Sequence, residues 1–538
     1  MKISASLFWA VLAFASPPFT VAGGTAAVDQ VPLYDDLGDH HHPITTSVPK
    51  TQRYFDQGLR LVYAFNHAEA IRAFEAGARL DPDCAMCYWG IALAYGPNIN
   101  APMDRESGIK AFAAVQKAAA LADRASAREQ AYIRALTKRY AADPPDDRAA
   151  LDAAYATAMG EVARRYPDDT DAATLYAEAL MDLSPWDYWT KDGRPYPRTG
   201  KILGSLEGVI ARNPNHPGAC HYYIHAVEAA RPERAVPCAE RLTKLMPGAG
   251  HLVHMPAHIY LRVGRYADAI ASNLHAVHAD EQYIADQQPQ GLYPLAYYPH
   301  NYHFLAFAAT MAGRSKQAIE AARAAAGKVP PEVAAEVPEL QGLLVYPHLT
   351  LVRFGRWEQV LEEPMPSPGL PIAAGLANYA RGVAFAAQRQ WGEAQAALER
   401  VQAAAQDAPE GIGRTVLKIA DQSLAGEIAG RRGDAQAAVE HFTRAMQLED
   451  SLQYMEPPFW YYPVRHSLGA ALLQAGRGAE AEARYREDLK RFPENGWALY
   501  GLARSLRAQG KTEEAARVEG RFRKAWSGAD VRLLASRF

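Results

Sequence analysis

The chain has 538 residues, with 57 Lys and Arg against 60 Asp and Glu, and a formal net charge of −3. A hydrophobic share of 49% and a charged share of 22% indicate a globular protein and exclude a disordered one. The near-neutral balance argues against a nucleic-acid-binding protein, which needs a basic surface. After the first residues, no apolar run reaches the ~18 residues of a membrane span.

Residues 1–23 follow the pattern of a secretory signal peptide. Lys2 supplies the positive charge, an apolar run extends over 7–14, and small residues near the end of the segment suit cleavage. We therefore expect export, with the mature protein periplasmic or secreted. Residues 24–50 lack periodicity and are predicted to be an extended leader. Its Asp-His-His-His tract at 39–42 has metal-binding residue types, but a tract of this kind in an unstructured leader is weak evidence for a metal site.

Four cysteines are too few for disulfides to hold a chain of this length together. Cys84 and Cys87 form a C-x-x-C pair, and Cys220 and Cys238 lie 18 residues apart. The sequence does not choose among the three connectivities. Residues 84–95 are predicted to be helical and no βαβ pattern surrounds them. A buried or oxidised structural pair is therefore favoured over a thioredoxin-like redox pair.

From residue 52 onward, helical periodicity dominates and strand patterns are nearly absent. One unit recurs: a helix, a turn centred on glycine, and a second helix. Two of these glycines, Gly476 and Gly510, lie 34 residues apart, which is the tetratricopeptide period, whereas Gly313 and Gly355 lie 42 apart. At each such turn, including that of Gly264, the glycine is expected to adopt the left-handed conformation. The sequence predicts an all-α fold, a right-handed superhelical solenoid of antiparallel helix pairs with degenerate repeats.

The predicted domain organisation places N-terminal repeats over 51–140, His-rich degenerate repeats over 141–310 and C-terminal repeats over 311–538. Three inserts rich in proline and aromatic residues interrupt the regular pattern, at 182–195, 286–299 and 456–463. Long ordered loops of this kind are often functional. The alternative is that they are aromatic plugs that cover helix edges.

Two motifs are the most distinctive part of the chain: His-Pro-Gly-Ala-Cys-His-Tyr-Tyr-Ile-His-Ala from His216, and His-Met-Pro-Ala-His-Ile from His254. With further stretches that begin at Gln52, Leu80 and Glu456, they resemble a large, mostly uncharacterised family of exported bacterial tetratricopeptide-repeat proteins. The resemblance covers nearly all of the mature chain. It implies a helical solenoid and export, and it implies no assigned reaction.

Ten of the 17 histidines fall within 216–303. A proline directly after His216 predicts a helix start there. His221 and His225 then share one helix face, one turn apart, and Glu228 continues that face. Such a pair can chelate one metal ion through two imidazoles. The zinc-protease motif would need a glutamate directly after the first histidine, and a tyrosine stands there, so that chemistry is not supported.

A second helix is expected to open at Pro256, with His254 just before it and His258 in its first turn. The first helices of adjacent repeats line the concave face, which predicts that their histidines converge. The predicted metal ligands are His221, His225, His254, His258, His300 and His303, and the residues predicted to orient them are Glu228, His216 and His251. Imidazole ligands favour Zn, Cu or Fe over Ca or Mg.

Two functions are open at this point. In both, we expect the protein to bind no nucleic acid and to have no membrane span. In the first, an exported solenoid binds a transition metal or a small polar ligand in a His-lined pocket, and whether it is a metal-dependent enzyme is undecided. In the second, the solenoid is a protein- or peptide-binding scaffold without catalytic activity. Imidazole nitrogens that converge on one point favour the first function, and nitrogens each paired to a carbonyl or carboxylate favour the second.

Overall fold

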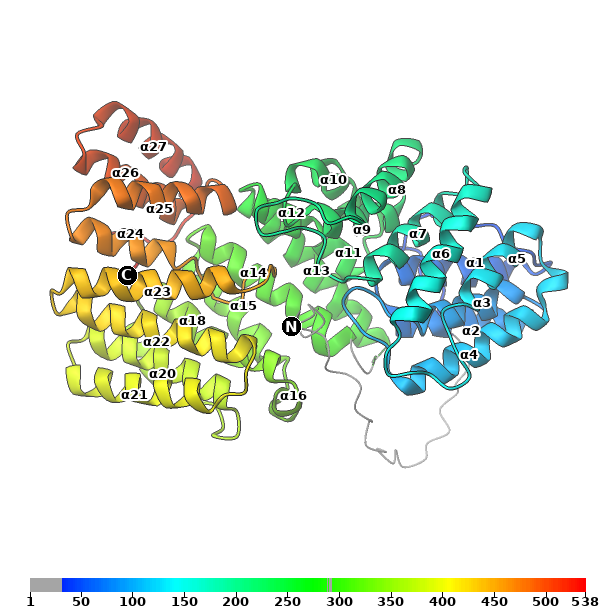
Figure 1. Cartoon of the computed structure of the whole chain (residues 1–538), viewed down its shortest axis with the longest axis horizontal. Helices are drawn as coiled ribbons and strands as arrows, with labels where there is room; N and C mark the ends of the chain where they lie inside the picture. Colours follow the sequence, from blue (N-terminus) through cyan, green and yellow to red (C-terminus); the bar gives the residue numbers. More distant parts are fainter. Residues whose placement is uncertain (1–30, 288, 290–292) are drawn as a thin grey trace. The chain divides into compact units, whose positions relative to one another are not determined.

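The computed structural model describes residues 31–287, 289 and 293–538. The predicted signal peptide lies outside these residues. The chain forms two compact units (Figure 1). Of the described residues, the first unit comprises 31–259 with 278–287, and the second comprises 260–277, 289 and 293–538.

The first unit is a succession of helices in which each packs mainly on its neighbours in the chain. Short turns join some of them, and longer loops at 95–104, 137–148 and 183–198 join others. Residues 31–48 contain no helix and run along α1; we call this segment the strap. The helices are α1 (Pro49–Tyr63), α2 (His67–Leu80), α3 (Ala85–Ala94), α4 (Arg105–Ala120), η2 (Ala122–Arg124), α5 (Ala127–Leu136), α6 (Ala149–Arg165), α7 (Thr170–Asp182), α8 (Thr199–Arg212), α9 (Pro217–Val227), η3 (Pro232–Ala235), α10 (Val236–Leu245) and α11 (Gly250–His254).

Helices α12 (Pro256–Arg262) and α13 (Tyr266–Gln287) contain residues of both units. The second unit repeats the pattern of packed neighbours, most extensively in the pairs α20–α21, α22–α23 and α26–α27. Its helices are η4 (Tyr293–Tyr297), α14 (Tyr298–Met311), α15 (Ser315–Gly327), α16 (Pro331–Glu336), η5 (Pro338–Leu340), α17 (Gln341–Leu344), α18 (Tyr346–Arg353), α19 (Trp357–Glu362), α20 (Pro371–Ala387), α21 (Trp391–Asp407), α22 (Ile412–Arg431), α23 (Ala435–Ser451), α24 (Arg465–Gln474), α25 (Gly478–Arg491), α26 (Gly496–Ala508) and α27 (Thr512–Ala525).

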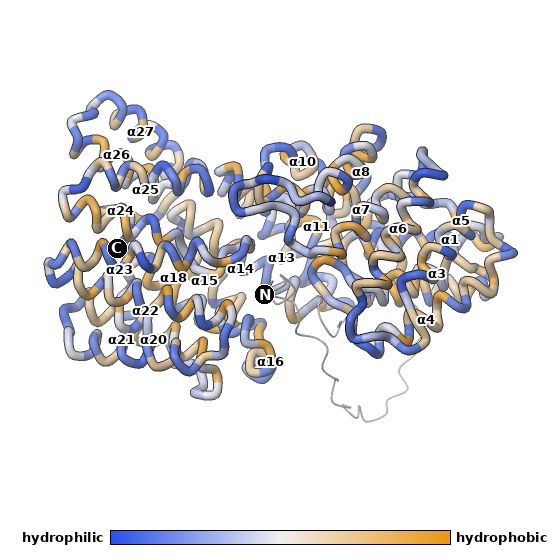
Figure 2. Tube along the Cα trace, in the orientation of Figure 1, coloured by the Kyte–Doolittle hydropathy of each residue, from blue (hydrophilic) through white to orange (hydrophobic). Residues whose placement is uncertain are grey.

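The turns have the glycine conformation that the sequence predicts. The glycines of the five predicted turns all have positive φ, between 65° and 78°: Gly264, Gly313, Gly355, Gly476 and Gly510. This left-handed conformation ends one helix and lets the chain reverse into the next. Hydrophobic and hydrophilic positions alternate along helices such as α20–α23, as packing on both neighbours requires (Figure 2).

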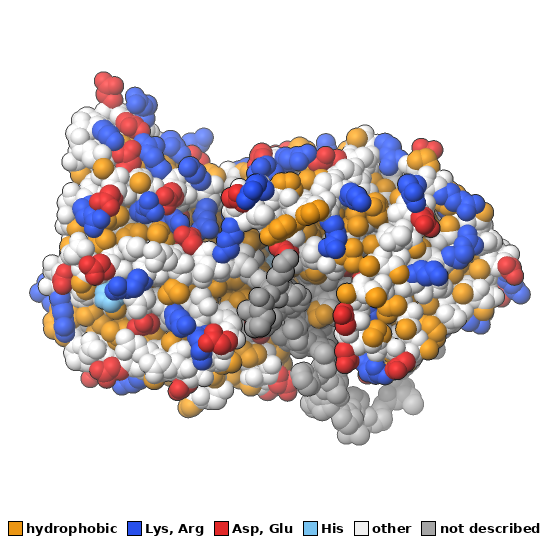
Figure 3. All heavy atoms as spheres, viewed as in Figure 1, with side chains coloured by type: hydrophobic (Ala, Val, Ile, Leu, Met, Phe, Trp, Pro, Cys, Tyr) orange, Lys and Arg blue, Asp and Glu red, His pale blue; other side chains and the backbone are white. Residues whose placement is uncertain are grey.

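The predicted all-α fold of antiparallel helix pairs is confirmed. The described residues contain no strand, and their extended pairing is limited to two isolated bridges, at 98–101 and 189–195. Within the described part of the chain, no helix combines the length and the apolar character that crossing a bilayer requires. Basic and acidic side chains are interspersed on the face shown in Figure 3, where histidine is nearly absent.

The cysteines are also placed. Cys84 and Cys87 form a disulfide where α3 begins, so the pair is oxidised, and its structural role stays a prediction. Cys220 and Cys238 are buried thiols whose sulfur atoms lie 2.9 Å apart.

Candidate metal centre

The candidate centre lies in the first unit and begins where α1 ends. Tyr63 is the last residue of α1, and the last carbonyl groups of a helix have no intrahelical donor. Phe65 then adopts a left-handed conformation with φ 56°, and Asn66 caps α2. The Tyr63 carbonyl is therefore available to a donor from elsewhere in the unit.

His221 on α9 is that donor. Its Nδ1 lies 2.7 Å from the carbonyl oxygen of Tyr63. Because a carbonyl only accepts, Nδ1 carries the proton, and Nε2 of the neutral ring keeps its lone pair. The helix itself begins as predicted, with His216 at the N-cap and proline in the first helical position.

His225 follows one turn later and is held in the same way. Its Nδ1 lies 2.8 Å from Oε1 of Glu228, a fully buried carboxylate at the end of α9. Nε2 of His225 is therefore also a lone-pair donor. Nε2 of His221 and Nε2 of His225 are both buried, and neither has a hydrogen-bond partner among the described residues.

His251 on α11 completes a group of three. It is buried, and its ring centroid lies 5.0 Å from that of His221. One ring nitrogen from each of His221, His225 and His251 lies within 4.8 Å of the other two. Two imidazole ligands of a tetrahedral zinc ion, with bonds of about 2.0–2.1 Å, are ~3.3 Å apart. The three nitrogens therefore lie close enough together to be candidate ligands of one ion.

Glu228 holds a further pair of imidazoles. Its Oε2 accepts a hydrogen bond from Nδ1 of His258 at 2.6 Å. Nε2 of His258 then faces Nε2 of His254 at 3.0 Å. Both residues lie where the sequence predicts, since His254 ends α11 and His258 is in the first turn of α12. One carboxylate therefore orients imidazoles from two parts of the chain.

Burial keeps the imidazoles of α9 neutral. It lowers the pKa of His221 well below its usual value, and the neighbouring His225 adds to the effect. It also lowers the pKa of His225, although Glu228 opposes that shift. Burial acts to raise the pKa of Glu228, but His258 and the hydrogen bonds from both imidazoles outweigh it and lower the pKa to about 2. Neutral imidazoles beside a carboxylate are the protonation states that metal binding needs.

Aromatic side chains cover the centre. The ring of Phe65 lies 4.5 Å from that of His221 and 5.6 Å from that of His251. Trp186, from the first of the predicted inserts, meets His225 edge-on at 4.9 Å. It has a φ of 63°, a conformation that strains a non-glycine residue and that recurs at functional sites.

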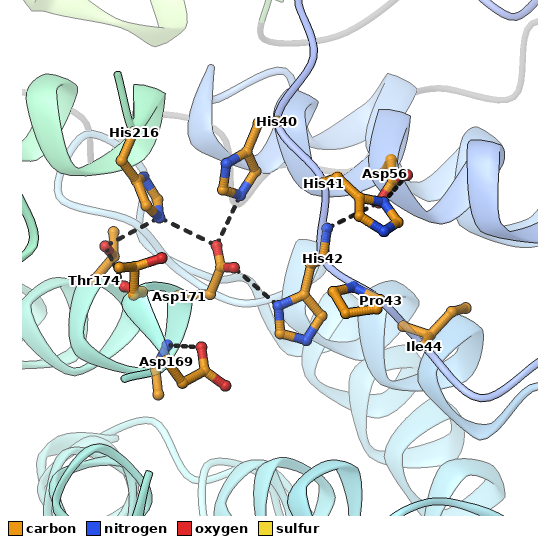
Figure 4. A network of polar contacts seen from close by, with 12 residues as sticks. His40, His41, His42, Pro43, Ile44, Asp56, Asp169, Asp171, Thr174 and His216 are labelled. Carbon is orange, nitrogen blue, oxygen red and sulfur yellow. Dashed lines mark hydrogen bonds and ion pairs between the residues drawn. The ribbon is translucent and has the colours of Figure 1, made fainter. Parts of the chain in front are cut away.

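A second histidine cluster surrounds Asp171 at the start of α7 (Figure 4). Oδ1 lies 2.9 Å from Nε2 of His40 and 3.2 Å from Nε2 of His216, and Oδ2 lies 2.8 Å from Nδ1 of His42. Placing the tract at 39–42 in an unstructured leader was wrong for His40 and His42. The Asp171 carboxylate holds both imidazoles against the unit, and the His42 side chain is only 5% exposed.

The structure brings most of the predicted residues of the centre together in the first unit: His221, His225, Glu228, His251, His254 and His258. His251, which we expected to orient ligands, offers a ring nitrogen to the group of three. His216, which we expected to do the same, contacts Asp171 instead. His300 and His303 lie on α14 in the second unit, and their participation stays a prediction.

Two residues of the site escaped the sequence reasoning. Tyr63 acts through a backbone carbonyl, for which no side-chain motif exists. Asp171 had a weak signal: it stands two residues after Asp169, the N-cap of α7, where acidic residues favour a helix start. This pattern predicts a helix start, but it does not predict that three imidazoles from distant segments contact Asp171.

Comparison with known proteins supports a tetratricopeptide repeat near the end of the chain. Residues 472–518, which span α25 and α26, match the family model of the tetratricopeptide repeat. A search of curated proteins gave no match. Human IFIT1, solved as a dimer with PPP-AAAA, is 12% identical with a TM-score of 0.33 over 89% of this chain and 91% of that one. Cut9 with Hcn1, from an APC/C hetero-tetramer, is 13% identical with a TM-score of 0.30 over 89% and 94%. At these TM-scores the likeness carries no functional argument.

Proposed function

We propose that the protein is an exported tetratricopeptide-repeat protein whose first unit binds a transition metal ion through His221, His225 and His251. The observation that carries the proposal is that Nε2 of His221 and Nε2 of His225 each have an unshared lone pair. Both atoms are buried and lack a partner among the described residues, while the Nδ1 of each ring is held by an oxygen acceptor. Leaving buried polar atoms unpaired destabilises a fold, so their persistence favours a ligand.

The alternative, a purely structural histidine network, predicts that every ring nitrogen pairs with a carbonyl or a carboxylate. The Nδ1 atoms meet that description, and the Nε2 atoms on α9 do not. An imidazole fixed through Nδ1 by a carbonyl or a carboxylate is the usual arrangement of a metal ligand, because the acceptor sets the tautomer and the ring orientation. This difference between the two nitrogens of each ring supports the metal-binding proposal.

Three imidazoles suit Zn, Cu or Fe and leave a coordination position for water or a small polar ligand. We include such a ligand, and metal-dependent chemistry upon it, in the proposal. Export fits the signal-peptide pattern and the Cys84–Cys87 disulfide, since disulfides persist in oxidising compartments. Both features support the proposal that the mature protein is periplasmic or secreted.

Metal analysis of full-length mature protein purified without a histidine tag tests the proposal. We expect about one equivalent of a transition metal, or recovery of one equivalent of Zn²⁺ after dialysis. His221→Ala and His225→Ala should lower this content severalfold. His441→Ala is the matched control, because that ring lies in the second unit and bonds to Gln422. Sub-stoichiometric metal in the wild type, or equal metal in all four proteins, would contradict the proposal.

A second candidate function, a protein- or peptide-binding scaffold, is favoured by the repeat at 472–518. Stacked helix pairs of this kind expose extended surfaces that suit a protein partner. The two functions are compatible, because the metal centre lies in the first unit and the matched repeat lies in the second. Crosslinking in native extracts, with peptides mapped by mass spectrometry, tests it: a scaffold predicts crosslinks that concentrate on α24–α27, and a scatter over the whole surface would count against it.

A further inference from the structure

Tyr63 connects the candidate metal centre to the cluster around Asp171. Its ring is fully buried. Its carbonyl oxygen accepts the Nδ1–H of His221 at 2.7 Å, and its hydroxyl donates to Oδ1 of Asp171 at 2.6 Å. The backbone and the side chain of one residue therefore take part in two different polar networks.

Asp171 meets four hydrogen-bonding groups. Besides the Tyr63 hydroxyl it faces His40, His42 and His216, each within 3.2 Å (Figure 4). Three of the four contacts, from Tyr63, His40 and His216, converge on Oδ1, and the fourth, from His42, goes to Oδ2. Burial acts to raise the pKa of Asp171, but these imidazoles outweigh it and hold the pKa well below its usual value. Asp171 is an anion fixed in place from several directions.

His216 is not a suitable metal ligand in this cluster. Nδ1 of His216 accepts the backbone N–H of Ala219 at 3.2 Å, as the N-cap of α9. In the neutral ring the proton is then on Nε2, and that atom donates to Asp171. An imidazole nitrogen that carries a proton does not ligate a metal. Through Asp171, the cluster joins segments that lie far apart in the sequence.

The segments that it holds are the strap, α7 and α9. The strap lies on α1, the helix that ends at Tyr63. Arg60 donates to the carbonyl of His40 at 2.7 Å, and the amide of His42 donates to Asp56 at 3.1 Å. On the other side, Gly218 of α9 packs so closely that a Cβ there would lie 2.4 Å from the Tyr63 ring. The position of Tyr63 is set by the strap and by α9 together.

We propose that His40, His42 and Asp171 are positioning residues for the metal-binding imidazole of His221, acting through Tyr63. This inference rests on the proposed metal site. With the strap docked, Asp171 fixes the Tyr63 hydroxyl, and the Tyr63 carbonyl fixes the tautomer and the direction of His221. With the strap displaced, the carbonyl loses this restraint and metal binding weakens. Docking of the strap and metal binding are then coupled, and linkage makes the coupling reciprocal.

Zn²⁺ affinity, measured on the metal-free mature protein by competition with a chromogenic chelator, tests the first half of the coupling. Loss of a group that orients a ligand typically weakens metal binding about 10- to 100-fold. We expect a loss of that size in Asp171→Asn and in His42→Ala. Tyr63→Phe removes only the hydroxyl and keeps the carbonyl that contacts His221, so it isolates the step through Tyr63 and should also weaken Zn²⁺ binding.

His41→Ala is the matched control within the same tract. Its side chain is 55% exposed and contacts Asp56, not Asp171, so its Zn²⁺ affinity should equal that of the wild type. A wild type that binds no Zn²⁺ refutes the metal site itself. A wild type that binds Zn²⁺, with Asp171→Asn and Tyr63→Phe binding equally well, overturns the positioning role and leaves the metal site standing.

Limited proteolysis of the wild type tests the reciprocal half without any substitution that could impair folding. Cleavage within the strap should slow severalfold when Zn²⁺ is added to the metal-free protein, while cleavage in the loops of the second unit stays constant. Equal strap cleavage with and without Zn²⁺, in protein shown to bind the ion, would overturn the coupling.

Discussion

Gly218→Ala gives a direct check of the packing that surrounds Tyr63. On an ordinary helix, replacing glycine by alanine stabilises by up to about 1 kcal/mol, because alanine loses less backbone entropy on folding. At this position a Cβ would lie 2.4 Å from Cδ1 and 2.6 Å from Cγ of Tyr63, distances at which ring or helix must move. Overpacking of a buried site costs about 1–3 kcal/mol. Gly218→Ala should therefore lower the stability of the protein, where the same change on an ordinary helix would raise it.

Gly204→Ala on α8 is the control, because a Cβ there meets no atom within 4 Å. Urea unfolding of both variants, followed by circular dichroism, provides the comparison. We expect a free energy of unfolding about 1–2 kcal/mol below the wild type for Gly218→Ala, and one up to about 1 kcal/mol above it for Gly204→Ala. Zn²⁺ affinity should fall in the first variant alone. Equal stabilisation by the two substitutions would refute the close contact between α9 and Tyr63.

Three further predictions concern other parts of the chain. Burial, helped by a nearby arginine, lowers the pKa of His67 to about 4, so only the unfolded chain takes up this proton as the pH falls from about 6.5 to 4. The free energy of unfolding should drop by about 2.6 kcal/mol over that range, and His67→Gln should lack this drop in urea titrations at each pH. His466→Ala removes the 2.8 Å contact to the buried Asp488 and should destabilise the second unit by ~3 kcal/mol, with unchanged metal content. Alkylation of denatured, unreduced protein should add two alkyl groups, on Cys220 and Cys238. Addition of four groups would disprove the Cys84–Cys87 disulfide.

The sequence predicted the parts of the site that depend on local periodicity. The i,i+4 spacing of His221 and His225 and the proline after His216 were sufficient to place two imidazoles on one face of α9. The proline between His254 and His258 was sufficient to place the second pair at a helix junction. Local rules also predicted the left-handed glycine turns and hence the antiparallel pairs.

What the sequence did not predict depends on contacts between distant segments. The Tyr63 carbonyl meets His221 across 158 residues, and Asp171 meets His40 across 131. Neither contact leaves a periodic trace. Residues 31–48 look like a leader because they lack periodicity, yet they pack on the unit through backbone and side-chain hydrogen bonds. Such segments are ordered by their partners, and their own composition does not show it.

The most direct test of the account is an anomalous difference map, collected at the Zn absorption edge from crystals of the mature protein grown with Zn²⁺. We expect one strong peak about 2.0–2.1 Å from Nε2 of both His221 and His225, with His251 as a further ligand. A map with no peak between these two rings, in crystals that show Zn²⁺ elsewhere, would contradict it.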